Sequence, residues 1–164
     1  MKRKLLGLLL VGAVFFTVGC GKKEEKKVED TTPKIICTAE EDSDGMKSTT
    51  VTTITIRDDK KYVKDYVSEI KMVVDDETMY NLYKDAMKSE LESEKDEDME
   101  YTINSDDANK TITIVMKATL TDERLNNATD EEKEEMEVKA VFEETDKTGG
   151  KCEFKNITKE ELGL

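Results

Sequence analysis

Apolar residues between positions 35 and 120 change their spacing twice, and this change constrains the fold more than any other feature of the chain. Residues 35–40, 46–57 and 61–74 are rich in threonine, valine and isoleucine, which suit the pleated surface of a β-sheet. Asp44-Gly45 and residues 58–60 stand between these segments and have the composition of tight turns. The pattern predicts three consecutive antiparallel strands.

The period then becomes helical. Apolar residues recur at intervals of three and four over residues 76–94, and the aspartates at positions 75 and 76 suit the N-terminus of a helix. Alternation returns in residues 100–105 and 110–120, which predict a further hairpin. We expect one face of the helix to carry Met79, Leu82, Tyr83, Met87 and Leu91.

Residues 131–145 fit two descriptions. Their charge density and the glycines that follow at positions 149 and 150 favour a helix, whereas Met136, Val138, Ala140 and Phe142 alternate as in a strand. The helix is our prediction, with the strand left open. Residues 151–157 predict a last strand or extended segment.

These elements predict an α+β fold. An antiparallel sheet, made of a three-strand meander and a further hairpin, packs on a central amphipathic helix, and a second, shorter C-terminal helix follows. The apolar helix face is expected to pack on one side of the sheet, formed by Ile54, Ile56, Tyr66, Ile70, Ile112, Ile114 and Met116. Such a core is aliphatic and sulfur-rich, so we expect no large ligand cavity.

The first 21 residues predict a location. Three cations at positions 2–4 precede an apolar run over residues 5–18, which is shorter than the span of about 20 residues that a transmembrane helix needs. Val18-Gly19-Cys20 resembles the lipobox of bacterial lipoproteins, although Thr17 stands where leucine is commonest. The resemblance implies cleavage before Cys20 and a diacylglyceryl group on its sulfur. Simple secretion or an uncleaved anchor is the alternative.

The chain divides into three parts. A lipoprotein signal peptide occupies residues 1–19, the lipidated Cys20 and a flexible charged linker occupy residues 20–33, and a single α+β domain occupies residues 34–164. The linker has one aliphatic side chain, Val28, and cannot bury enough surface to offset the entropy lost on ordering. Pro33 marks the expected edge of the domain.

Lipidation of Cys20 leaves Cys37 and Cys152 as an even pair in an exported domain, where disulfides persist. A bridge between them would close a loop of more than 100 residues and contribute about 4–5 kcal/mol in the entropic account. Two free thiols are the alternative.

Composition excludes several function classes. The net charge of −13 becomes −16 once the three cations of residues 1–19 are removed, and a surface this acidic argues against nucleic acid binding. The chain has no histidine, which removes Ser-His-Asp and Cys-His catalysis and the common zinc sites. We therefore expect no catalytic, cofactor-binding or metal-binding residues.

Three local motifs have simpler explanations. Residues 40–45 resemble the start of a calcium loop, but Val51 stands at position twelve, so a hairpin turn is the better interpretation. Ser68-x-x-Lys71 matches the acylating-serine motif, but on a strand these two side chains point to opposite faces. Tyr80-x-x-x-Lys84 resembles the short-chain dehydrogenase pair without a dinucleotide loop, which indicates a coincidence on the surface.

The lipobox, charged linker, threonine-rich strands, amphipathic helix and late cysteine resemble the small lipoproteins of low-GC Gram-positive bacteria. In layout alone they are similar to the YehR-like lipoproteins of unknown function. The resemblance implies an α+β domain tethered to the extracytoplasmic face of the cell membrane by the lipid on Cys20, and it transfers no catalytic residue. We expect a non-enzymatic module that binds a protein or other envelope component through an exposed sheet or helix face. The alternatives are a carboxylate-dependent envelope hydrolase and a weak acidic cation-binding protein.

Overall fold

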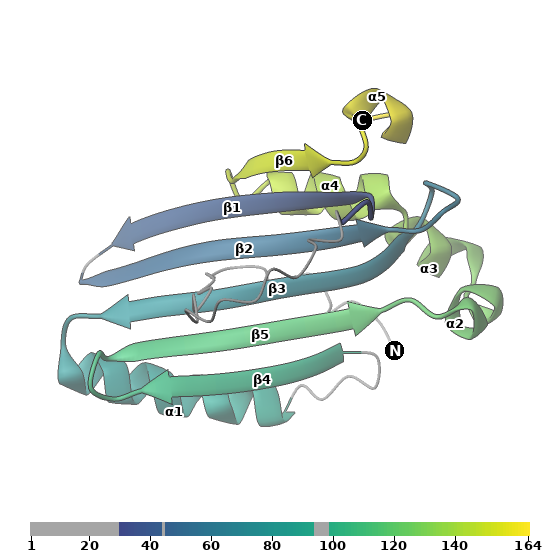
Figure 1. Ribbon diagram of the computed structural model, residues 1–164. Coiled ribbons are helices and arrows are strands. Elements are labelled where there is room, and N and C mark those ends of the chain that lie inside the picture. The colour runs from purple at the N-terminus through teal and green to yellow at the C-terminus, as the bar shows by residue number, and fades with distance from the viewer. Residues whose placement is uncertain (1–29, 44, 94–98) are drawn as a thin grey trace, which may run out of the picture.

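The structure, a computed structural model, describes residues 30–43, 45–93 and 99–164. A single six-stranded sheet dominates it, with the order β4-β5-β3-β2-β1-β6 and every neighbouring pair antiparallel (Figure 1). The first and last strands of the domain are therefore neighbours. The strands are β1 (Lys34–Ser43), β2 (Met46–Ile56), β3 (Val63–Val74), β4 (Met99–Asp106), β5 (Thr111–Thr119) and β6 (Lys151–Lys155).

Short turns fix the register of the first three strands. Ser43 pairs with Met46 across the β1–β2 turn, where Gly45 has a φ of 82°, a conformation that glycine adopts without strain. At the β2–β3 turn the Asp59 carboxylate accepts hydrogen bonds from the backbone N–H groups of Lys61 and Tyr62. The calcium-loop resemblance thus lies in a hairpin, as the sequence indicated.

All described helices lie on one side of the sheet or at its ends. Behind the sheet in Figure 1, α1 lies along β4 and β5, and α4 lies along β1 and β2, while α2 and α3 stand at one end. The opposite sheet face has no described helix over it. The helices are α1 (Glu77–Ser93), α2 (Asp122–Asn127), α3 (Asp130–Glu135), α4 (Val138–Asp146) and α5 (Lys159–Leu162).

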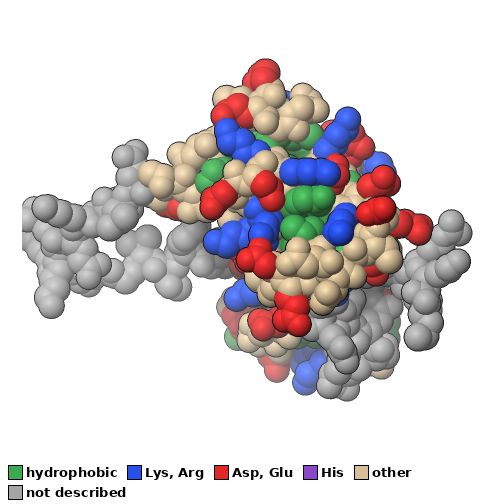
Figure 2. Space-filling model, turned by 90° about the vertical axis from the view of Figure 1, so that its right-hand side faces the viewer, with side chains coloured by type: hydrophobic (Ala, Val, Ile, Leu, Met, Phe, Trp, Pro, Cys, Tyr) green, Lys and Arg blue, Asp and Glu red, His purple; other side chains and the backbone are tan. Residues whose placement is uncertain are grey.

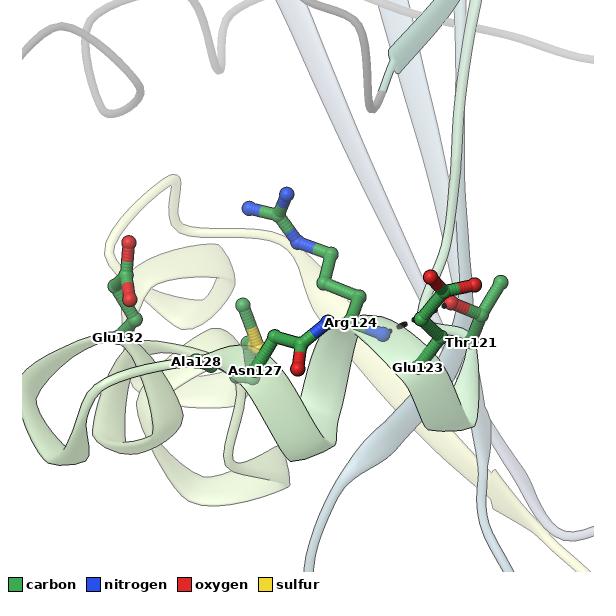
Figure 3. Close-up of a pocket in the computed structure, with 7 residues that line it drawn as sticks. Thr121, Glu123, Arg124, Asn127, Ala128 and Glu132 are labelled. Carbon is green, nitrogen blue, oxygen red and sulfur yellow. Dashed lines mark hydrogen bonds between the residues drawn. The ribbon is translucent and has the colours of Figure 1, made fainter.

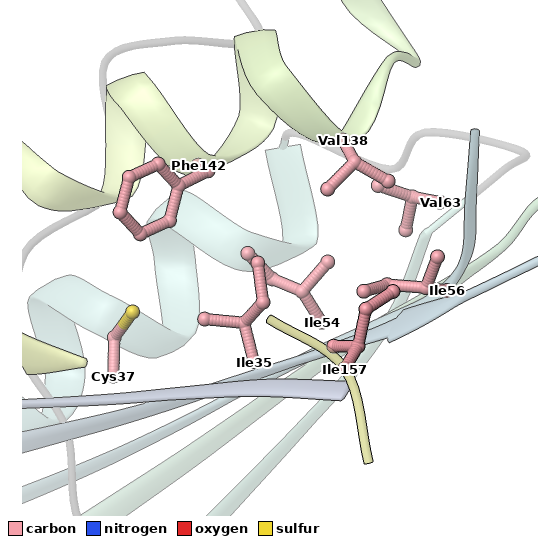
Figure 4. Packing of buried hydrophobic residues seen from close by; sticks show 8 residues of the cluster. All are labelled: Ile35, Cys37, Ile54, Ile56, Val63, Val138, Phe142 and Ile157. Atoms are coloured by element: carbon pink, nitrogen blue, oxygen red, sulfur yellow. The ribbon is translucent and has the colours of Figure 1, made fainter. Parts of the chain in front are cut away.

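Two apolar clusters fill the space between the sheet and these helices. The cluster beneath α4 contains Ile35, Cys37, Ile54, Ile56, Val63, Val138, Phe142 and Ile157 (Figure 4). The cluster beneath α1 contains Ile70, Met72, Val74, Tyr80, Leu91, Ile112, Ile114 and Met116. By register, Thr52 and Ser68 separate Cys37 of the first cluster from Met116 of the second, so a strip of hydroxyls divides the core.

The predicted packing of the sheet on a central amphipathic helix is wrong. Strands form 45% and helices 31% of the structure, and α1 covers only one half of the sheet. The reason is that the sheet is wider than a single helix. Strands lie about 4.8 Å apart, so six of them span roughly 24 Å, whereas a helix with its side chains is only about 10 Å wide. One helix cannot cover such a sheet, and the short C-terminal helices cover the other half.

The predicted inward face of α1 is also wrong in part. Leu91 is buried, and Tyr83 and Met87 pack against the same cluster, but Met79 is 40% exposed and Leu82 is 60% exposed. The buried residue in their place is Tyr80. Its hydroxyl donates a hydrogen bond of 2.6 Å to Asp107 in the β4–β5 turn, which turns this side of the helix toward the sheet.

The ambiguous segment 131–145 is helical, but it forms two helices. The helices are separated at Met136 and Glu137, where the backbone forms hydrogen bonds with the chain at the start of β3. Val63 N–H donates to the Met136 carbonyl, and Val138 N–H donates to the Lys61 carbonyl. Before this segment in the chain lies α2, for which the sequence predicts no element, and Thr121 caps this helix by accepting a hydrogen bond from Arg124 N–H.

Candidate functional site

The face of the sheet over which no described helix lies, here called the open face, is the candidate site. The antiparallel register places its side chains in rows across the strands. Ile36 on β1 lies opposite Thr53 on β2, which lies opposite Val67 on β3. In the next row, Val51 on β2 and Val115 on β5 flank Glu69 on β3. Figure 1 views the sheet from this side.

The centre of the open face is apolar and rich in threonine. Ile36, Val51, Val67 and Val115 are half-buried, although no described helix covers them. Their β-branched side chains have few rotamers, so little side-chain entropy is lost when another surface packs on them. The outward threonines around them are Thr38, Thr49, Thr53, Thr55, Thr102, Thr111, Thr113 and Thr119.

Charges on the open face nearly balance, although the whole chain carries −13. Six lysines and seven acids point outward, which leaves this face with a net charge of −1. They are Lys34, Lys47, Lys71, Lys117, Lys151 and Lys155 with Glu40, Asp42, Asp65, Glu69, Glu100, Asp106 and Glu153. The end of the molecule near α2 and α3 also mixes the two signs around a small hydrophobic patch (Figure 2).

Glu69 stands near the middle of the open face. Burial raises the pKa of its carboxyl above the ordinary value, and the positive charge of Lys71 lowers that pKa in part. Glu69 makes no hydrogen bond or close ion pair with another described residue. Sequence reasoning did not single out this residue, because only the strand register shows that valines of two other strands flank it.

The two cysteines of the domain form a disulfide on the opposite, helix-covered side of the sheet. Cys37 on β1 pairs with Cys152 on β6, their Cα atoms lie 4.0 Å apart, and their sulfur atoms are bonded. This is the pair that the sequence predicted. The predicted lipidation site, Cys20, lies outside the described residues.

The acylating-serine motif is not assembled. Ser68 is 1% exposed on the helix-covered side, where its hydroxyl lies 3.4 Å from that of Thr52, while Lys71 points to the open face. Tyr80 and Lys84 do meet. Both donate hydrogen bonds to Asp107, which holds α1 to the β4–β5 turn, so this pair has a structural role that its spacing alone did not indicate.

A shallow cavity of about 320 Å³ lies at α2 and α3 (Figure 3). Glu132, one of its lining residues, accepts hydrogen bonds from the backbone N–H and the hydroxyl of Thr129, which lowers the pKa of its carboxyl. That carboxylate is engaged in capping α3. The lining residues are Thr121, Glu123, Arg124, Asn127, Ala128, Glu132 and Met136.

Over the described ranges, no three acids or cysteines are grouped as metal ligands. Within the same ranges, no helix is long and apolar enough to cross a bilayer. Comparison of the chain with models of known protein families, with curated proteins and with solved structures gives no match.

Proposed function

We propose that this chain is a lipid-anchored extracytoplasmic lipoprotein and that its domain is a non-enzymatic module which binds a protein partner through the open face. The observation that carries the proposal is the half-buried centre of Ile36, Val51, Val67 and Val115, over which no described helix lies. An apolar patch surrounded by polar residues is typical of an interaction site.

The size of the open face supports a protein partner. Strands lie about 4.8 Å apart and rise about 3.3 Å per residue, so six strands of about ten residues present roughly 800 Å². A standard protein–protein interface buries about 800 Å² on each partner. A flat surface of this extent favours a macromolecule over a small ligand, which binds in a concave site.

The N-terminal sequence supports the anchor. Val18-Gly19-Cys20 fits lipidation. Asn156 and Ile56 already hold residues 30–33 to the domain, so the spacer is the nine residues from 21 to 29, which would reach roughly 30 Å when extended and hold the domain away from the lipid headgroups. The predicted test is Cys20→Ala followed by cell fractionation. The substituted protein should lose normal processing and leave the membrane fraction. Unchanged processing and membrane retention would refute the anchor.

Photo-crosslinking in living cells tests the binding surface. A photoreactive amino acid at Thr53, in the middle of the open face, should give a discrete crosslinked product. The matched control is Lys139, an exposed residue on α4. A Val51→Arg substitution should abolish the Thr53 product without changing the circular dichroism spectrum, because a large cationic side chain then covers the apolar centre beside Glu69. No product from Thr53, or the same product from both positions, would reject the open face as the site.

A further inference from the structure

We propose that the open face receives a cationic side chain of its protein partner, a lysine ammonium or an arginine guanidinium, at Glu69. This inference rests on the proposed function and identifies the chemistry of the contact. It assigns to Glu69 the central polar contact of the open face, whose centre is apolar and rich in threonine.

The position of Glu69 suits such a contact. Val51 and Val115 flank it on the two neighbouring strands, and Val67 precedes it on the same side of β3. Lysine and arginine carry long apolar stems below their charged groups. A stem lying on these valines would place its charged end beside the carboxylate. The apolar stem would then contact apolar side chains, and the cation would contact an anion.

The electrostatics of Glu69 also favour a cation. Burial removes part of the hydration of the carboxylate, and the positive charge of Lys71 on the same strand offsets this loss only in part. A carboxylate that has lost hydration without gaining hydrogen bonds binds a charged donor more strongly than a fully solvated one. Contacts near the centre of an interface, where the partner excludes water, commonly carry much of the binding energy.

Several other acids of the open face already have partners. Asp65 accepts a hydrogen bond of 2.9 Å from the Thr119 hydroxyl. Asp42 pairs with Lys47 and Glu153 pairs with Lys155, both in exposed positions. Asp106 caps its own turn by accepting hydrogen bonds from the N–H groups of Ala108 and Asn109. Glu69 differs from these acids in being both half-buried and unpaired among the described residues.

The rest of the chain affects how this contact must be tested. A net charge of −13 attracts cations to the whole molecule, so weak binding of a positive probe is expected anywhere on the acidic surface. A specific site must therefore be separated from this background by its location and by a substitution that changes the same charge elsewhere on the open face.

The first test is an NMR titration of the ¹⁵N-labelled full-length chain in zwitterionic nanodiscs. The probe is N-acetyl-lysine methylamide, and the neutral norleucine analogue is its control. Saturable amide shifts should centre on Val51, Glu69 and Val115 with the lysine probe only. Glu69→Gln should weaken this binding at least about tenfold, whereas Glu153→Gln, the same charge change at the sheet edge, should leave it unchanged. Shifts that are scattered over the surface, or that persist in Glu69→Gln, would overturn the inference.

The second test separates this inference from the proposed function. In cells, Glu69→Gln should reduce the Thr53 crosslink about tenfold, and Glu153→Gln should preserve it. If the Thr53 crosslink persists at full yield in Glu69→Gln, the cationic contact is wrong and the open face remains the binding surface. If the protein with the crosslinker at position 53 and Glu69 unchanged gives no crosslinked product, the proposed function itself is wrong.

Discussion

At the residue scale, the buried Tyr80 and the partly buried Tyr66 have hydroxyl groups in very different surroundings. The hydroxyl of Tyr80 donates to the Asp107 carboxylate at 2.6 Å. The hydroxyl of Tyr66 is buried and has no hydrogen-bond partner among the described residues. Burial raises the pKa of this hydroxyl, and the nearby hydroxyls of Thr52 and Ser68 lower that pKa in part. A buried polar atom without a partner costs stability, typically about 1–3 kcal/mol.

Matched tyrosine substitutions test this contrast. Tyr66→Phe removes the unpartnered hydroxyl and should leave the melting temperature unchanged or raise it. Tyr80→Phe removes a hydrogen bond to a carboxylate and should lower the melting temperature, because Asp107 then loses a donor. Differential scanning calorimetry of both variants gives the comparison. A lower melting temperature in Tyr66→Phe would show that its hydroxyl is satisfied in solution.

The same contact predicts a pH dependence. The Tyr80 hydroxyl, followed by Lys84, lowers the pKa of Asp107 below its ordinary value of 3.8. The folded state therefore gains stability from this group above about pH 4, and the gain is lost as the pH falls through the lowered pKa. In Tyr80→Phe the pKa of Asp107 should rise toward its ordinary value, as measured by carboxyl NMR titration. The pKa of Glu161 on α5, which Lys60 lowers, serves as the control and should not move.

At the scale of single elements, α1 shows that helical periodicity identifies a helix more reliably than it identifies the buried side. The spacing of Met79, Leu82, Tyr83, Met87 and Leu91 locates the helix correctly, between Glu77 and Ser93. Tyr80 is buried instead of Met79 and Leu82, because its hydroxyl reaches Asp107 while its ring packs in the core.

Two leucine substitutions test which side of α1 faces the sheet. Leu91 is 7% exposed, so Leu91→Ala should lower the free energy of unfolding by about 2–5 kcal/mol. Leu82 is 60% exposed, so Leu82→Ala should change it by less than about 1 kcal/mol. Urea denaturation followed by circular dichroism provides both values. Equal losses for the two variants would mean that α1 is rotated differently in solution.

At the scale of the whole molecule, the disulfide joins the two ends of the domain. Cys37 and Cys152 are 115 positions apart, and the bond attaches the short edge strand β6 to β1. Beside it, the rings of Phe142 and Phe154 lie 5.7 Å apart and hold β6 against α4. The fold is thus closed by one covalent link at the edge of the sheet that has the shortest strand.

The double variant Cys37→Ala/Cys152→Ala should lower the free energy of unfolding by about 5 kcal/mol, because the unfolded chain regains the entropy of a loop of this length. Guanidinium denaturation of oxidised wild type and the variant measures the loss. Reduced wild type is the control and should resemble the variant. If reduction leaves the stability of wild type unchanged, the bond is not stabilising the fold.

The sequence by itself determined the strands, the first hairpin, α1 and the cysteine pair of this protein. Alternating threonine, valine and isoleucine placed the strands, aspartate and glycine placed the first hairpin, a spacing of three and four placed α1, and the cysteine count paired Cys37 with Cys152. These features depend on residues close together in the chain or, for the cysteines, on elimination. The open face was predicted only as one of two possible exposed surfaces.

Only the tertiary structure decided how the elements combine. A sheet of six strands is wider than one helix, so the core divides into two clusters and α1 covers one half. The register across β2, β3 and β5 places Glu69 between Val51 and Val115, although the three residues are far apart in sequence. Strand order and register arise from contacts between distant segments, and for that reason local periodicity could not reveal the candidate site.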